Sequence, residues 1–259
     1  KRVFKVTIVA ENGEEKVLVL KLFIADGYTD VEEFNLIKSL EPTGVVQKIY
    51  TKEPVFVSYK GVKEMAILEE YIQGKALGEF KGADAETVKQ AAFAYGDASG
   101  KLWISRKRTD DGIERGLIFE DKRLQNTLIS RENGILAAKV IDISSDKLGF
   151  GSFAGTFAEL VMERRAGLAL LSKDPSVIEE FLLGVSRHLG EKRKEMLLAA
   201  VQDIEKKYSS IAPQYIPAYI GDLKKAIDKV SRLSDEELRL LVGTRGGAHI
   251  KLRQEILKS

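Results

Sequence analysis

The sequence predicts an α+β protein in which a small antiparallel sheet with one helix precedes a larger, mainly helical part. Within residues 3–72 apolar and polar residues alternate in several short runs, which is the period of a half-buried strand. Across residues 153–259 apolar residues recur instead at helical spacing. Glycines interrupt the pattern at residues 73–78, so we predict an N-terminal domain of residues 1–73 and a C-terminal domain of residues 74–259.

The N-terminal region begins with a predicted β-hairpin. Residues 3–10 and 16–23 alternate apolar and polar side chains, and the Glu-Asn-Gly-Glu-Glu stretch between them is typical of a turn. Residues 29–40 have apolar positions at helical spacing and begin with Thr29 or Asp30 as a possible N-cap, which predicts one helix. Three further strands are predicted, at residues 45–50, 55–59 and 65–72.

The C-terminal region is predicted to be helical apart from short strands. A long helix is expected over residues 85–103, and an Arg-Glu-Asn-Gly turn is expected to join strands at 127–130 and 135–141. We interpret the basic triplet at 106–108 as the solvated end of the long helix, and the glycine-rich residues 149–155 as a turn that leads into a helix. Further helices are predicted at residues 153–171, 175–190, 191–208, 214–231, 234–242 and 248–257.

The composition excludes several kinds of chemistry. The chain has no cysteine and only two histidines, which excludes disulfides, thiolate zinc sites and cysteine nucleophiles and leaves carboxylate, lysine or metal-phosphate chemistry. A formal net charge of +2 gives no general attraction to nucleic acid. No apolar run reaches the ~20 residues that a membrane span needs, and the N-terminus lacks the layout of a signal peptide. We therefore expect a soluble, cytoplasmic protein with no membrane partner.

The most informative pattern for function lies between Phe119 and Asp142. The stretch Phe119-Glu-Asp121-Lys-Arg-Leu-Gln-Asn126 is followed by a strand, a turn and a second strand that leads to Asp142. This is the spacing with which kinase-like phosphotransferases bring oxygen-bearing side chains to Mg-ATP. With the order of elements, it resembles the protein-kinase-like superfamily, most closely its small-substrate branch, the aminoglycoside phosphotransferase-like kinases. The resemblance implies a bilobal fold with a sheet N-lobe and a helical C-lobe.

The resemblance implies roles for four residues of the C-terminal part. Asp121 corresponds to the catalytic carboxylate that orients the acceptor hydroxyl and takes its proton, and Arg123 to a basic side chain near the γ-phosphate. Asn126 and Asp142 correspond to the ligands of Mg²⁺, which prefers hard oxygen donors. Each acidic or amide residue taken alone is more common as a cap of its own turn, so it is the joint pattern that favours the catalytic interpretation.

In the N-terminal part the resemblance implies a nucleotide site. Lys21 corresponds to the strand lysine that contacts the α- and β-phosphates of ATP, and Glu33 to the helix glutamate that orients this lysine, with Glu32 as the adjacent alternative. Taken alone, such charged residues are usually solvated. In the stretch Leu-Glu-Glu-Tyr-Ile-Gln-Gly, the carbonyl of Glu70 and the amide of Ile72 correspond to the backbone groups that bind adenine.

The sequence departs from the family's pattern at several places. Glu69 occupies a position that is usually apolar, at the back of the nucleotide pocket, and Phe119-Glu120 replaces the usual histidine before the catalytic Asp. Asp142 is not followed by a Phe-Gly pair and no Ala-Pro-Glu segment occurs, which disfavours a loop switched by phosphorylation. The family's first strand and glycine-rich phosphate loop have no counterpart, so either they precede residue 1 or the protein holds phosphates without them.

Three functions are compatible with these residues. The first is an ATP- and Mg²⁺-dependent phosphotransferase, a kinase that moves the γ-phosphate to a hydroxyl of a small molecule or RNA. The second is a catalytically silent kinase-like (pseudokinase) module that binds nucleotide or a partner, and the third is an atypical protein Ser/Thr kinase, which the missing activation segment disfavours. Basic clusters in the C-terminal part suit an anionic acceptor, either RNA or an anionic metabolite.

Overall fold

The N-terminal region forms a four-stranded antiparallel sheet and one helix in the computed structural model. The structure describes residues 2–24, 29–108, 114–119, 124–132, 134–141, 148–151, 174–208 and 216–243. The N-terminal elements are β1 Arg2–Val9, β2 Glu15–Ile24, α1 Thr29–Leu40, β3 Val55–Tyr59 and β4 Val62–Glu70. Their sheet order is β1-β2-β4-β3. The predicted hairpin, helix 29–40 and strand 55–59 are confirmed, and the strand predicted at 65–72 begins and ends earlier, as β4.

Residues 45–50, which were predicted to be a strand, do not form a regular strand, and we call them the bridging segment. Val46 forms an isolated parallel bridge with Val140, whereas Ile49 forms an antiparallel bridge with Glu69 of β4. The amide of Val140 donates to the carbonyl of Val45 at 2.7 Å. Because the segment's first half pairs with the C-terminal part and its second half pairs with the N-terminal sheet, no continuous ladder forms.

The C-terminal part combines two three-stranded sheets with five long helices among the described residues. Its strands are β5 Gly74–Ala76, β6 Arg106–Arg108, β7 Glu114–Phe119, β8 Thr127–Glu132, β9 Ile135–Val140 and β10 Leu148–Gly151. Its helices are α2 Ala85–Ile104, α4 Pro175–Ser186, α5 Arg193–Tyr208, α6 Ile216–Ser231 and α7 Asp235–Gly243. The sheet orders are β10-β7-β6 and β5-β8-β9. Short 3-10 helices lie at Glu41–Thr43, Leu77–Phe80, Leu124–Asn126 and Gly190–Lys192.

The predictions for the C-terminal part are confirmed for the long helix, for the β8–β9 hairpin and, within a few residues at each end, for helices α4 to α7. Two predictions are wrong. The basic triplet Arg106–Arg108 is strand β6 rather than a helix end, and residues 148–151 are strand β10 rather than part of a turn, because both pair with β7 in antiparallel ladders. The helices predicted at 153–171 and 248–257 lie outside the described residues.

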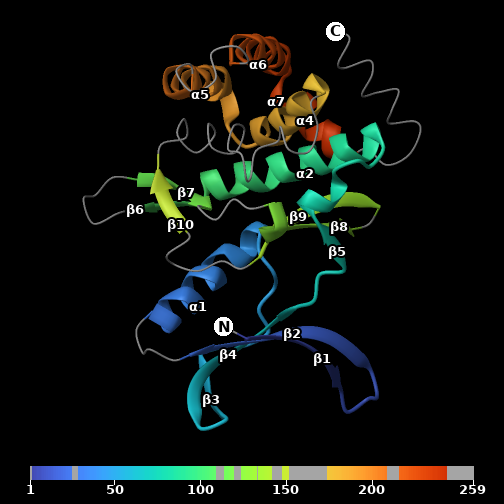
Figure 1. Cartoon of the computed structure of the whole chain (residues 1–259), viewed down its shortest axis with the longest axis vertical. Helices are drawn as coiled ribbons and strands as arrows, with labels where there is room; N and C mark the ends of the chain where they lie inside the picture. Colours follow the sequence, from blue (N-terminus) through green and yellow to red (C-terminus); the bar gives the residue numbers. More distant parts are fainter. Residues whose placement is uncertain are drawn as a thin grey trace.

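Figure 1 shows how these elements are arranged. The N-terminal sheet lies at the bottom, α1 and the small sheets lie in the middle, and α2 crosses below α4 to α7. One cluster of buried apolar side chains runs from α1 through the bridging segment and α2 to α7. None of the described helices has an apolar stretch long enough to cross a membrane. This is the predicted α+β fold, with a small antiparallel sheet before a mainly helical part.

Helices α2 and α4 pack closely because each helix has a glycine where it meets the backbone of the other. A Cβ on Gly96 would lie 2.1 Å from the carbonyl oxygen of Phe181, and one on Gly184 would lie 2.3 Å from the carbonyl oxygen of Phe93. Both distances are below any real van der Waals contact, so each position accepts only glycine while the helices stay this close. The crossing therefore depends on two residues without side chains.

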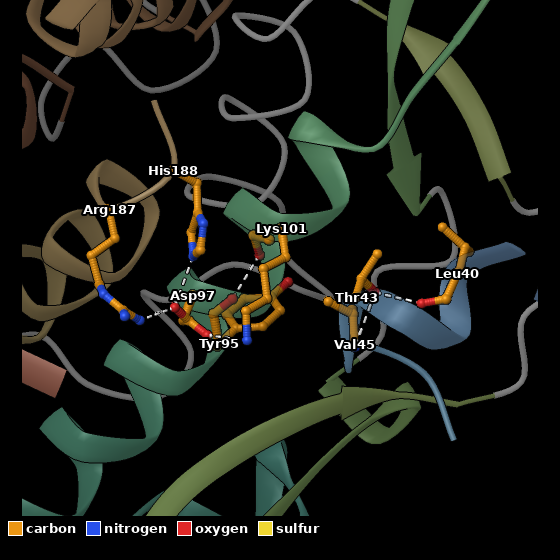
Figure 2. A network of polar contacts seen from close by, with 9 residues as sticks. Leu40, Thr43, Val45, Tyr95, Asp97, Lys101, Arg187 and His188 are labelled. Atoms are coloured by element: carbon orange, nitrogen blue, oxygen red, sulfur yellow. Dashed lines mark hydrogen bonds and ion pairs between the residues drawn. The ribbon is translucent and has the colours of Figure 1, made fainter. Parts of the chain in front are cut away.

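A half-buried polar cluster closes one end of the α2–α4 contact (Figure 2). Asp97 of α2 binds Lys101 Nζ at 2.9 Å, His188 Nε2 at 2.8 Å and a terminal guanidinium nitrogen of Arg187. Burial alone would raise the pKa of Asp97, but the hydrogen bond from His188 and the charges of Lys101 and Arg187 outweigh burial and hold this pKa at about 2. The carboxylate is therefore ionised over the whole range in which most proteins are folded.

The same view shows how α1 is joined to the bridging segment. The hydroxyl of Thr43 donates to the carbonyl of Leu40 at 2.6 Å and accepts from the amide of Val45 at 3.1 Å. Gly44 adopts φ 71°, a left-handed conformation that glycine reaches without strain. This turn sets the direction in which the bridging segment leaves the helix.

Candidate active site

Lys21 is buried in the middle of the N-terminal sheet. It lies on β2 opposite Ile67 of β4, and its side chain shares a sheet face with Glu69, which pairs with Val19 two positions along. Lys21 is 6% exposed and Glu69 is 1% exposed. Lys21 Nζ lies 2.6 Å from Glu69 Oε2, so the ammonium that the resemblance assigns to ATP has a buried carboxylate beside it.

The predicted partner of Lys21, Glu33, lies on α1, and its side chain is outside the described residues, as is that of the alternative Glu32. The Lys21–Glu33 ion pair therefore remains a prediction. The acidic partner that the described residues give to Lys21 is Glu69. Sequence reasoning found Glu69 only as a charged residue at a usually apolar position. In the sequence, Glu69 stands out only as a carboxylate within an apolar run. That its partner is Lys21 depends on the register between β2 and β4.

The contact between Lys21 and Glu69 is an ion pair. Nζ and Oε2 are 2.6 Å apart, and neither carboxylate oxygen of Glu69 has a further hydrogen-bond partner among the described residues. A buried carboxylate normally accepts several hydrogen bonds, because losing water is costly for a charged group. The attraction that holds Glu69 in place is therefore mainly the charge of Lys21.

Gln47 of the bridging segment joins Lys21 to the expected adenine-binding strand. Its Oε1 lies 3.4 Å from Lys21 Nζ, and its Nε2 donates to the carbonyl of Glu70 at 3.3 Å. That carbonyl is the group that the resemblance assigns to adenine, and a carbonyl has a second lone pair for another donor. Ile72, which supplies the corresponding amide, is buried at 8% exposure. The sequence analysis did not identify Gln47, whose only signal is an amide within an apolar run.

The side chain of Glu70 connects the end of β4 to the strand before Asp142. Glu70 Oε2 lies 2.8 Å from Lys139 Nζ on β9 and accepts from the amide of Lys48 at 3.3 Å. Lys139 also lies 3.3 Å from Glu132. Burial acts to raise the pKa of Glu70, but the bonds from Lys139 and Lys48 outweigh it and lower this pKa below its usual range. Burial acts to lower the pKa of Lys139, but the hydrogen bonds and charges of Glu70 and Glu132 outweigh burial and raise this pKa.

Asn126 lies beside the end of β9. It is 6% exposed, and its backbone carbonyl accepts from the amide of Ile141 at 2.8 Å. Ile141 is the residue directly before Asp142, so the structure brings the backbone of Asn126 next to the residue that precedes the second predicted metal-binding position. Asp142 itself, Asp121 and Arg123 lie outside the described residues. Within the described ranges, no group of three or more acidic or histidine side chains is placed to hold a metal ion.

The described site residues form a connected series of contacts. Lys21 contacts Glu69 and Gln47, and Gln47 contacts the carbonyl of Glu70. The carboxylate of Glu70 contacts Lys139, which lies two residues before Ile141 and therefore near Asn126. The N-terminal sheet is thus joined, side chain by side chain, to the strand end that precedes Asp142.

No protein-family model matches this chain, and no curated protein matches it. Among solved structures it is similar to one described as "WaaP in complex with acyl carrier protein". The TM-score is 0.37 and the sequence identity is 12%, over 87% of this chain and 84% of that chain. A likeness this distant carries no conclusion about the activity, substrate or partners of this chain.

Proposed function

We propose that the chain is an ATP- and Mg²⁺-dependent phosphotransferase that moves the γ-phosphate to an acceptor hydroxyl. The observation that supports this most is the contact series from Lys21 through Gln47 and Glu70 to Lys139, near Asn126. In this series the buried ammonium of Lys21 lies on β2 and the buried amide of Asn126 lies directly before β8. The linker at residues 71–73 lies between these two strands in the sequence. In this proposal residues 1–73 and 74–259 are the two lobes, and nucleotide binds where they face each other.

Each proposed role follows from what its side chain can do. The ammonium of Lys21 would neutralise the α- and β-phosphates, and the carbonyl of Glu70 and amide of Ile72 would bind the base. Asp121 would orient the acceptor hydroxyl and take its proton, while Arg123 would stabilise charge on the transferred group. Glu33 would orient Lys21 once nucleotide is bound.

The donor set fits a magnesium ion. An amide oxygen from Asn126 and a carboxylate from Asp142 are hard donors, and Mg²⁺ usually takes only one or two protein ligands besides phosphates and water. When bound, the ion would neutralise phosphate charge during transfer. The neighbouring backbones of Asn126 and Ile141 support this pairing.

A nucleotide-binding module without catalysis is the second candidate, and one observation favours it. The charge of Lys21 is already balanced by Glu69, which weakens its attraction for phosphate. For either candidate we propose an anionic acceptor or partner, RNA or an anionic metabolite, because of the basic clusters of the C-terminal part.

Thermal unfolding with nucleotides tests the binding half of the proposal. ATP at about 100 times its Kd should add about 2.7 kcal/mol to the free energy of unfolding, and ATP without Mg²⁺ should add less. Equal melting temperatures with and without ATP would contradict both candidates.

Transfer assays on RNA and on metabolite pools then separate the two candidates. We expect D121N to keep the ATP-dependent shift and lose transfer by at least about a hundredfold, because only the proton acceptor is removed. D203N, at an exposed aspartate of α5, is the matched control and should transfer normally. Full transfer by D121N would refute the role of Asp121, and ATP binding without any transfer by the unmodified protein would favour the silent module.

A further inference from the structure

Lys21 is already paired with a carboxylate, whereas a phosphate-binding lysine needs an unneutralised positive charge. Glu69 and Lys21 are both more than nine-tenths buried, and their charged atoms are 2.6 Å apart. Coulomb attraction is stronger in such a place than in water, because little solvent screens it. An incoming phosphate would meet an ammonium whose charge is neutralised and a carboxylate that repels it.

We infer that Glu69 is the counter-ion that holds Lys21 in the nucleotide-free protein and has to yield it to the nucleotide phosphates, so that Glu69 sets the affinity for the phosphate part of the nucleotide. This inference rests on the proposed function in one respect, which is that Lys21 receives phosphate. Glu69 acts here through Lys21 and is a positioning residue. It is not proposed to touch the transferred group.

The geometry explains why the exchange would limit nucleotide affinity. Apart from Lys21, no described residue hydrogen-bonds either oxygen of Glu69, so moving Lys21 away leaves a buried carboxylate without its counter-charge, and this cost opposes phosphate binding. Gln47 Oε1, 3.4 Å from Lys21 Nζ, is a neutral acceptor that remains available while the ammonium shifts. Because β2 and β4 are paired along their length, the exchange requires side-chain rotation and no movement of strands.

Nucleotide affinities of charge-removing variants test the inference. E69Q keeps the size of the side chain and removes its charge, and we expect it to lower the Kd of Mg-ATP and Mg-ADP by about tenfold, measured by isothermal titration calorimetry. The Kd of adenosine, which has no phosphate, should not change. E69L, which also removes the charge, should shift ATP and ADP in the same direction and covers the case in which E69Q folds poorly.

Glu64 provides a matched control on the same strand. Like Glu69 it is 1% exposed on β4 and paired with a cation, but its partner is Arg2. E64Q should bind all three ligands as the unmodified protein does, even if its stability falls. In a K21M background E69Q should no longer tighten ATP binding, because the effect acts through Lys21.

The outcomes distinguish the inference from the proposed function. If the unmodified protein binds ATP and the charge-removing variants bind it equally or more weakly, the counter-ion role is wrong and the proposed function stands. An equal gain for adenosine would also overturn the inference, since it would indicate a change in pocket shape rather than charge. If none of the proteins binds any of the three ligands, the proposed function fails, and the inference fails with it.

Discussion

The carboxylate of Glu70 lies 2.8 Å from the ammonium of Lys139, and this ion pair joins the last residue of β4 to β9. The pair is only partly buried, so its contribution to stability is modest. It nevertheless connects the strand that leads to the linker with the strand that leads to Asp142. Its energetic value can be measured without any ligand.

We expect K139M to lower the free energy of unfolding by about 0.5–1 kcal/mol at neutral pH and low salt, and by less in concentrated salt, because solvent and ions screen a partly exposed pair. Denaturant titration at two salt concentrations measures this. K75M, at an exposed lysine of β5, is the control and should change stability by less than about 0.5 kcal/mol. Equal losses in the two variants would argue against the ion pair.

The pH range of this contribution follows from the two pKa shifts. The pKa of folded Glu70 is lowered from 4.5, so its stabilisation is complete above that value and is lost as pH falls through the lower folded pKa. The pKa of folded Lys139 is raised from 10.5, so its stabilisation is present below that value and is lost as pH rises through the higher folded pKa. The stability difference between K139M and the unmodified protein should therefore be flat between about pH 5 and pH 10.

Asp97 should be a larger electrostatic contributor. A pKa lowered from 3.8 to about 2 corresponds to about 2 kcal/mol of stabilisation, since one pKa unit is worth about 1.4 kcal/mol. We expect D97N to lose about this much at pH 7, because Lys101 and Arg187 are left close together without a carboxylate. D222N, at a partly exposed position on α6 where the aspartate has only a 3.8 Å contact with Lys225, is the control.

The same shift predicts how the D97N effect depends on pH. The folded pKa is depressed, so the stabilisation is present above pH 3.8 and disappears as pH falls toward about 2. Denaturant titrations of both proteins at pH 7, 4 and 3 should show a difference that is nearly constant from pH 7 to 4 and clearly smaller at pH 3. A difference that grows on acidification would contradict the assignment.

The glycines at the α2–α4 crossing give a test of packing. G184A would place a methyl group 2.3 Å from the carbonyl oxygen of Phe93, so the helices must separate, and we expect a loss of about 3 kcal/mol or more. G221A, in the interior of α6, meets nothing within 4 Å and should stabilise the protein by about 0.5–1 kcal/mol, because alanine favours a helix over glycine. Opposite signs for one type of substitution in two helices would confirm the close crossing. A neutral G184A would rule it out.

The elements that sequence analysis predicted best are those whose signal is local. The hairpin of β1 and β2, helix α1 and helix α2 each follow from a period of two or of about 3.6 residues in their own stretch of chain. The bridging segment looked equally strand-like, but its pairing is divided between Glu69 and Val140, which no local period can indicate. Strand β6 was missed for the same reason, since its ladder with β7 is formed by residues further along the chain.

In the candidate site, too, the residues could be singled out from local motifs, but most of their contacts could not. Lys21 and Asn126 were singled out from the sequence by their resemblance to family motifs, and the structure shows only that both are buried. The contacts of Glu69, Gln47 and Lys139 depend on strand register and on the meeting of distant segments, so the sequence alone did not reveal them. The roles of all candidate site residues remain predictions, which are Lys21, Glu33, Glu70, Ile72, Asp121, Arg123, Asn126 and Asp142.

The bridging segment has a mechanical consequence for the molecule. The N-terminal sheet is connected to the helical part at residues 70–73, by the chain itself and by the ion pair of Glu70 with Lys139, and again by the hydrogen bond between Val45 and Val140. A body held to another at two separate points turns most easily about the line through them. Relative movement of the two parts should therefore be a rocking about one axis rather than a free swing, and any opening that admits a ligand has a single preferred direction.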